Sequence, residues 1–122
     1  MTSPRNTSWL GKFAAAGRGV VIAVLGERSF RVHLPAAAAV IGGGFYLRTT
    51  AAEWCVLLLC IAGVGTAELL NTAVERLAAA VDTADNPRIR DALDIASGAV
   101  LWFSCFAAVI GGVVFVTAWG RM

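Results

Sequence analysis

Charged residues are scarce in this sequence. Of its 122 residues, 15% are Asp, Glu, Lys or Arg and 58% are hydrophobic, whereas roughly 25% of the residues of an ordinary soluble domain are charged. A disordered chain is excluded, because such chains lack the hydrophobic residues that are abundant here. The composition therefore predicts a small integral membrane protein. Three helical spans of about 20 residues each would use half of the chain, so we expect residues 1–122 to form a single membrane domain.

Other features that would indicate a soluble function are also missing. The three cysteines are odd in number and show no C-x-x-C spacing, which indicates neither a disulfide framework nor a zinc site. The sequence contains no G-x-x-x-x-G-K-[ST] motif, so a P-loop nucleotide site is excluded. The net charge of +2 is too small to indicate nucleic-acid binding, for which a clustered basic surface is expected.

The sequence does contain a succession of apolar helical segments. Over residues 7–25 the apolar side chains recur at helical spacing, and Lys12 and Arg18 fall among the polar positions, which is typical of an amphipathic helix in the membrane interface. Three longer segments are predicted to be membrane spans: residues 30–47, residues 51–81 with a cytoplasmic extension, and residues 92–120. The predicted fold is therefore all-α, with one surface helix and three transmembrane helices.

The distribution of positive charge predicts the orientation of these spans. Of the ten Lys and Arg residues, only Arg48 and Arg121 lie on the side to which the first span leads. Because membrane-flanking segments rich in Lys and Arg stay in the cytoplasm, we expect a cytoplasmic N-terminus and a C-terminus outside. Most of the acidic residues then lie at the cytoplasmic interface as well.

Three polar side chains form a stripe at the end of the second predicted span. Glu68, Asn71 and Glu75 are spaced i, i+3 and i+7, so they share one face of a helix. Glu68 follows fourteen uncharged residues, and an ionisable side chain near the hydrocarbon edge usually faces a partner or a functional cavity. Two carboxylates and an amide also suit Mg²⁺, which prefers oxygen ligands. The alternative is a solvated helix end at which the carboxylates pair with nearby arginines in water.

The sequence around this stripe is similar to that of a known family. Glu68-Leu-Leu-Asn-Thr-Ala-Val-Glu75 resembles the signature helix of the small bacterial membrane diacylglycerol kinase and undecaprenol kinase family. Residues 27–34 resemble the segment before the family's first span, and residues 92–101 resemble the opening of its third span. Together these segments extend the resemblance over the chain from about residue 10 to residue 115.

The resemblance implies a lipid kinase. It implies transfer of the γ-phosphoryl group of ATP, with Mg²⁺, to a membrane lipid alcohol: diacylglycerol, which gives phosphatidic acid, or undecaprenol, which gives undecaprenyl phosphate. It also implies a homotrimer with active sites shared between subunits, at the cytoplasmic face of the bacterial cytoplasmic membrane. By position, the family's general base is matched by Glu68, its Mg²⁺ ligands by Glu27 and Glu75, and its supporting polar residues by Asn71 and Asp94.

The positions that would contact the nucleotide depart from the family pattern. Leu93 stands where the family carries a lysine that contacts the phosphates. We hypothesise that Arg90, one helical turn before Asp94, supplies this cation, and Arg18 falls where the family often has a basic residue in the surface helix. Leu93 also leaves open a catalytically degenerate family member that acts as a small structural or partner-binding membrane protein.

Two remaining interpretations concern other ionisable side chains. A small ion or drug carrier would place an ionisable residue near the middle of a span, and residues 95–120 contain none, so this alternative is ranked last. His33 is interpreted as an interfacial side chain and not as a ligand.

Overall fold

The computed structural model describes residues 8–81 and 85–122 of the chain. These residues form four helices: α1 Trp9–Gly26, α2 Phe30–Tyr46, α3 Ala51–Val81 and α4 Pro87–Gly120. The predicted all-α fold is confirmed. Two predicted features lie outside the described residues: the helix start at residue 7, and residues 82–84 between the second and third predicted spans.

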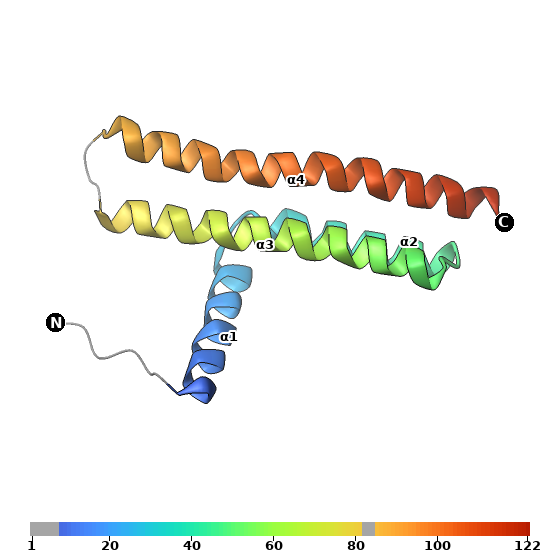
Figure 1. Cartoon of the computed structure of the whole chain (residues 1–122), viewed down its shortest axis with the longest axis horizontal. Helices are drawn as coiled ribbons and strands as arrows, with labels where there is room; N and C mark the ends of the chain where they lie inside the picture. The colour runs from blue at the N-terminus through green and yellow to red at the C-terminus, as the bar shows by residue number, and fades with distance from the viewer. Residues whose placement is uncertain (1–7, 82–84) are drawn as a thin grey trace.

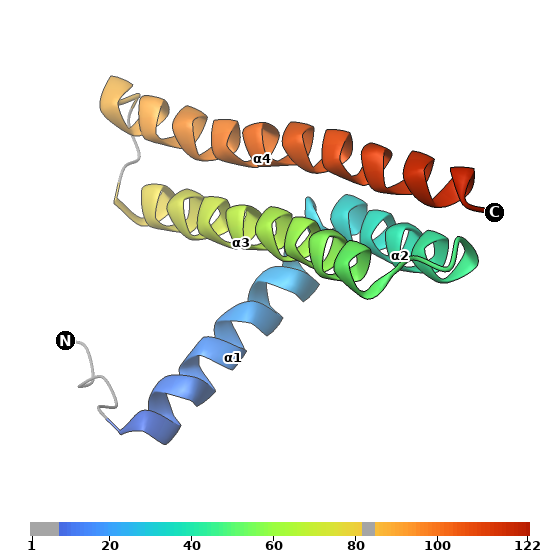
Figure 2. The same cartoon turned by 45° about the vertical axis from the view of Figure 1, so that its right-hand side comes forward.

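Helices α2, α3 and α4 lie side by side, whereas α1 runs crosswise to them (Figures 1 and 2). α3 packs mainly against α4 and to a smaller extent against α2. By length and composition, three of the described helices are able to cross a membrane, and these are α1, α3 and α4. The predicted first span, α2, is slightly shorter at 17 residues, but it lies along α3. A bilayer that is crossed by α3 is therefore crossed by α2 too, which favours the predicted surface position for the crosswise α1.

The first turn of α1 shows why the helix begins at Trp9. The Ser8 Oγ accepts a hydrogen bond from the Gly11 N–H at 3.0 Å, and serine is a favoured residue at this capping position. The Lys12 ammonium lies 4.9 Å from the centre of the Trp9 ring. Trp9 and Leu10 are 74% and 82% exposed. Exposed apolar side chains next to a basic residue are typical of a helix that lies on a membrane surface.

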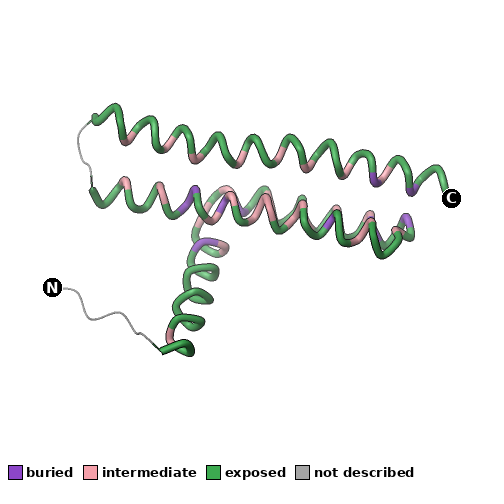
Figure 3. The backbone as a smooth tube through the Cα atoms, viewed as in Figure 1, coloured by how far each residue is buried: buried purple, intermediate pink, exposed green. Residues whose placement is uncertain are grey.

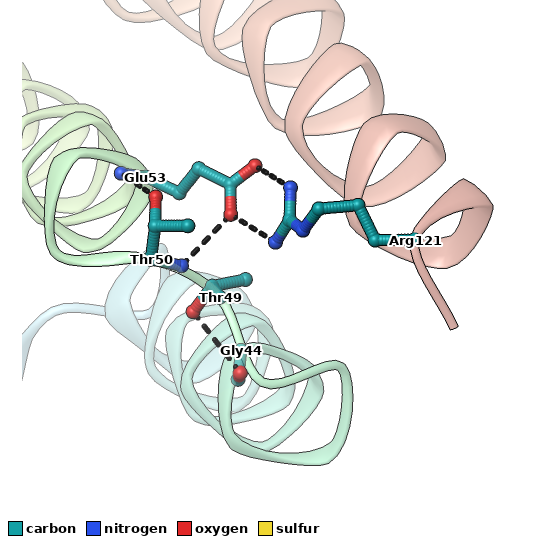
Figure 4. Close-up of polar contacts among 5 residues, drawn as sticks. All are labelled: Gly44, Thr49, Thr50, Glu53 and Arg121. Atoms are coloured by element: carbon teal, nitrogen blue, oxygen red, sulfur yellow. Dashed lines mark hydrogen bonds and ion pairs between the residues drawn. The ribbon is translucent and has the colours of Figure 1, made fainter.

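Hydrogen bonds fix the turn between α2 and α3 and tie it to the end of α4 (Figure 4). The Thr49 Oγ1 donates to the Gly44 carbonyl at 3.1 Å. Thr50 and Glu53 cap α3 reciprocally, because the Glu53 N–H donates to the Thr50 Oγ1 at 3.2 Å and the Thr50 N–H donates to the Glu53 Oε1 at 2.8 Å. Arg121 donates two hydrogen bonds to the Glu53 carboxylate, at 2.8 and 2.6 Å. The first turn of α3 and the end of α4 are therefore joined.

α4 begins before residue 92, where the third membrane span is predicted to start. The helix starts at Pro87, and the side chain of Asn86 accepts a hydrogen bond from the Arg88 N–H at 2.9 Å. Asparagine at the capping position followed by proline in the first turn is a strong start signal. This signal precedes the apolar segment on which the prediction was based, so the helix has a polar extension, and Asp94 lies within α4.

Most residues along the described helices are exposed, as the predominance of green in Figure 3 shows. Few hydrophobic residues are buried in the part of the chain that the structure describes, and they are Ala23, Phe30, Leu47, Leu57, Val114 and Ala118. Large side chains such as Trp102 and Val116 are 71% and 74% exposed. Exposing so much apolar surface to water is unfavourable, whereas hydrocarbon removes this penalty. The exposed surface agrees with a membrane protein.

Two glycines allow the helices to approach one another closely. A Cβ atom at Gly63 of α3 would overlap the Phe103 ring of α4, and a Cβ atom at Gly44 of α2 would overlap the Trp54 ring of α3. Small residues at such contacts are a common means of packing helices in membranes. The position of Gly63 is therefore part of what holds α3 against α4.

Candidate functional site

The buried polar residues of the described chain lie close together on α3. Glu68, Asn71 and Thr72 are 3%, 7% and 4% exposed, although α3 is otherwise largely apolar up to this point. A solvated helix end would leave these side chains exposed. The burial of Glu68 therefore excludes the alternative in which this carboxylate is simply hydrated.

Glu68 is held by the start of α2. The Ser29 Oγ donates a hydrogen bond to the Glu68 Oε1, and the His33 Nε2 lies 3.3 Å from the Glu68 Oε2. Sequence reasoning missed Ser29 and assigned His33 to the interface without a partner. The available signal was their spacing of four residues at the start of a helix, which places both side chains on one face.

Asn71 and Glu75 form the next part of the site. The Asn71 Nδ2 donates to the Glu75 Oε1 at 3.0 Å. The Asn71 Oδ1 and the Thr72 Oγ1 are buried and have no hydrogen-bond partner within the described residues. The great majority of buried polar atoms are hydrogen-bonded, so an unpartnered carbonyl oxygen beside a carboxylate marks a place where a cation or a hydroxyl group would bind.

Glu27 joins the end of α1 to α3. The Arg76 Nε and Nη2 both donate to the Glu27 Oε1, at 3.1 and 3.0 Å. Glu27 is the first residue after α1, where the backbone becomes extended. The junction between α1 and α2 is thus tied to α3 at two places, by Glu27 and by Ser29.

The remaining predicted site residues lie outside this network. Arg90 forms an ion pair with Asp85 near the start of α4, and Arg18 and Asp94 are exposed. Within residues 8–81 and 85–122, Arg18 and Asp94 have no polar contact with Glu68 or Asn71. The structure therefore brings Glu68, Asn71 and Glu75 together on α3 and ties Glu27 to the same helix. Arg18 of α1 and Arg90 and Asp94 of α4 are not joined to this network by a polar contact.

Apolar grooves adjoin the polar site. One groove of about 780 Å³ runs between α3 and α4 from Gly63 and Phe103 to Asn71. A second, of about 300 Å³, lies among α2, α3 and α4 and includes His33. The polar site therefore opens onto surfaces that suit hydrocarbon.

A metal site assembled from three or more His, Cys, Asp or Glu side chains is not found within the described residues. Neighbouring oxygen atoms on α3 are the Glu75 carboxylate and the unpartnered Asn71 Oδ1. Glu27 offers a further carboxylate beside Arg76, to which its Oε1 is bound. Oxygen donors fit a hard cation such as Mg²⁺, which keeps several waters and phosphate oxygens in its coordination shell.

These features define a membrane protein that holds a buried carboxylate beside apolar surfaces, at the end of a helical bundle. Residues 14–115 match the family model described as prokaryotic diacylglycerol kinase. The chain therefore belongs to the prokaryotic diacylglycerol kinase family, which is a family of lipid kinases.

Two relatives illustrate the similarity. The chain is 36% identical over 104 residues to an undecaprenol kinase from Bacillus subtilis (strain 168), and the alignment covers 85% of each protein. It is also 36% identical over 104 residues to a diacylglycerol kinase from Synechocystis sp., with 84% of this chain but 59% of that protein covered. No solved structure matches the chain. The family resemblance in the sequence is confirmed.

Proposed function

We propose that this protein transfers the γ-phosphoryl group of ATP to the hydroxyl group of a membrane lipid alcohol at the cytoplasmic interface. The observation that carries the proposal is the burial of the Glu68 carboxylate, which is 3% exposed and directly follows the uncharged segment 54–67 of α3. An ionisable residue in such a position is costly and marks function by default. Membership of a lipid kinase family supplies the reaction class.

In this proposal Glu68 is the general base. The lipid hydroxyl oxygen attacks the γ-phosphorus, the bond from that phosphorus to the bridging oxygen of ADP breaks, and the hydroxyl proton passes to the Glu68 carboxylate. A carboxylate offers about four lone-pair positions, and Ser29 and His33 approach one oxygen each. The substrate hydroxyl therefore has an acceptor left on Glu68. Asn71 and Asp94 are proposed to act as supporting polar residues.

Glu27 and Glu75 are the proposed Mg²⁺ ligands. Asn71 supports this role because its Nδ2 orients the Glu75 carboxylate and its unpartnered Oδ1 adds a further oxygen donor. When bound, Mg²⁺ would neutralise charge on the transferred phosphate, and phosphoryl transfer depends mainly on such neutralisation and on positioning. On α3, the protein keeps the Asn71 and Glu75 oxygens one and two helical turns from Glu68.

Arg18 and Arg90 are proposed to contact the nucleotide phosphates. Arg90 is paired with Asp85, and its side chain is 55% exposed, so a phosphate would compete with Asp85 for the guanidinium. Arginine suits this purpose because its planar guanidinium can donate two hydrogen bonds to one phosphate. In this way Arg90 would supply the cation that Leu93 does not.

The groove between α3 and α4 is the proposed position of the lipid chain. It is lined mostly by apolar side chains, and it reaches Asn71, one turn from Glu68. Diacylglycerol and undecaprenol would both present hydrocarbon there. We place undecaprenol first, because the relative that carries this name is covered over 85% of its length.

The proposed assembly is a homotrimer in the bacterial cytoplasmic membrane, with the N-terminus in the cytoplasm and the C-terminus outside. The exposed apolar surface of the helices supports burial against lipid and further subunits. The positive-charge distribution supports the orientation, because only Arg48 and Arg121 lie at the opposite end.

A kinase assay tests the proposed function. Purified full-length protein in nanodiscs would receive Mg·ATP with diacylglycerol or undecaprenol, each offered separately. We expect phosphorylation of at least one lipid, and a loss of roughly 10²- to 10⁴-fold in kcat for Glu68→Gln, the range typical of a general base. Glu53→Gln is the matched control, since it makes the same change at the other end of α3.

The same assay separates the alternatives. Equal turnover by the wild type and Glu68→Gln would contradict the role of Glu68 as base. Absence of turnover with both lipids would favour the degenerate family member, the alternative to which Leu93 points.

A further inference from the structure

Both oxygens of the Glu68 carboxylate are engaged by a single turn of the neighbouring helix. The Ser29 Oγ donates to the Oε1, and the His33 Nε2 lies 3.3 Å from the Oε2. The two partners are separated from Glu68 by more than thirty residues in the sequence. Their contact with Glu68 is therefore a product of how α2 packs on α3.

The backbone at the start of α2 explains why these two side chains reach Glu68 together. The His33 N–H donates to the Ser29 carbonyl at 3.2 Å, so the residues are one helical turn apart and lie on the same face. The Glu68 side chain is 4% exposed and that of His33 is 25% exposed. His33 consequently closes the site toward its exposed side, while Ser29 approaches from the α1–α2 turn.

Polar contacts on both oxygens restrict the plane of a carboxylate. A carboxylate with no partner rotates about its last side-chain bond, which has a broad torsional preference. The hydrogen bond from Ser29 to the Oε1 and the His33 ring nitrogen 3.3 Å from the Oε2 limit this rotation in Glu68. They also give polar partners to a buried carboxylate, whose burial without partners would be costly.

A purely structural role is the competing explanation for these contacts. The α1–α2 junction is already tied to α3 by the two hydrogen bonds from Arg76 to Glu27. Phe30, buried to 5% exposure between the two partners, adds apolar packing at the same place. The attachment of α2 to α3 therefore does not depend on Ser29 and His33 alone.

We propose that Ser29 and His33 are positioning residues of the kinase reaction: they orient the Glu68 carboxylate and keep it ready to accept the lipid hydroxyl proton. This inference rests on the proposed function, because it assigns Glu68 as the base. Neither residue contacts the nucleotide in this assignment. Their loss should thus affect kcat and leave the KM for ATP unchanged.

The test compares variants of the full-length protein in nanodiscs. A hydrogen bond to a charged group corresponds to roughly a ten- to hundredfold effect, so we expect Ser29→Ala to lower kcat by about this factor. His33→Phe removes the polar contact at 3.3 Å and should lower kcat as well. Ser29→Thr and His33→Gln retain a donor and should restore most of the rate. Ser97→Ala, at an exposed serine of α4, is the matched control and should retain wild-type kcat.

A double-mutant cycle separates positioning from structure. In a Glu68→Gln background, Ser29→Ala should cause no further loss of kcat, because there is no carboxylate left to orient. A full additional loss in that background, or a raised KM for ATP, would overturn the proposal. Thermal unfolding of each variant identifies any that fail to fold. If Ser29→Ala or His33→Phe does not fold, the kcat of Ser29→Thr and His33→Gln tests the positioning role instead.

The outcomes also distinguish this inference from the proposed function. Wild-type kcat in Ser29→Ala and His33→Phe, with Glu68→Gln inactive, would overturn the positioning role and leave the lipid kinase function in place. Wild-type turnover in Glu68→Gln would overturn the role of Glu68 as base and the positioning role with it.

Discussion

Replacing Asn71 by leucine is expected to weaken the binding of Mg²⁺ without lowering the stability of the protein. The substitution keeps a side chain of similar volume and removes both polar atoms of the amide. It therefore deletes the hydrogen bond from the Nδ2 to the Glu75 Oε1, which is 3.0 Å long, together with the buried Oδ1 that has no partner in the described residues.

The expected effect on stability follows from two opposing contributions. Glu75 is exposed, so water replaces the lost hydrogen bond at a cost of about 1 kcal/mol. Removing a buried acceptor that has no partner returns about 1–3 kcal/mol. Their sum lies between about 0 and 2 kcal/mol in favour of the folded variant, so the midpoint of thermal unfolding should not fall.

The expected effect on Mg²⁺ is larger. Without Asn71 the Glu75 carboxylate loses its orientation, and the site loses one of its candidate oxygen donors. Removing a group that orients a metal ligand typically costs about 10- to 100-fold in metal affinity. We expect the concentration of free Mg²⁺ at half-maximal rate to rise by about this factor for Asn71→Leu, with ATP held saturating.

Thr72→Val provides the control for this experiment. Its Oγ1 is also buried and unpartnered within the described chain, so, unlike Asn71, Thr72 donates no side-chain hydrogen bond that orients Glu75. The variant should leave the Mg²⁺ dependence unchanged. The reasoning is refuted by an unaltered Mg²⁺ titration in Asn71→Leu, or by an equal shift in Thr72→Val.

Two other predictions concern the helix packing and the nucleotide. Gly63→Val should destabilise the protein by about 1–3 kcal/mol, because the valine side chain would overlap the Phe103 ring of α4. Thermal unfolding in detergent measures the change in stability. An unchanged unfolding midpoint would contradict the close contact between Gly63 and Phe103. Arg90→Ala should raise the KM for ATP and should not change the KM for the lipid. An unchanged KM for ATP would exclude Arg90 as the cation that replaces the family lysine.

Hydropathy and turn residues predicted the bounds of a helix correctly where both ends of the helix are visible in the sequence. The apolar segment over 51–81 gave the bounds of α3, Ala51–Val81, since its turn residues and its polar extension are both visible in the sequence. α4 starts before the predicted span of residues 92–120, because the Asn86 cap precedes the apolar segment. A helix start depends on capping chemistry, which hydropathy does not register.

The candidate site was predictable only in part. The stripe of Glu68, Asn71 and Glu75 followed from spacing on a single helix, because residues three and four apart share a face whatever the helix packs against. The hydrogen bond between Asn71 and Glu75 is of this local kind. The family resemblance added Glu27, which lies outside the stripe.

By itself, then, the sequence determined an all-α membrane protein of the lipid kinase family with carboxylates gathered at one end of its spans. The tertiary structure alone decided which side chains meet Glu68 and Glu27. Ser29 and His33 reach Glu68, and Arg76 reaches Glu27, across intervals of 35 to 49 residues. These contacts depend on the crosswise turn from α1 into α2 and on the alignment of α2 with α3, and no periodicity within a single helix encodes the relative placement of two helices.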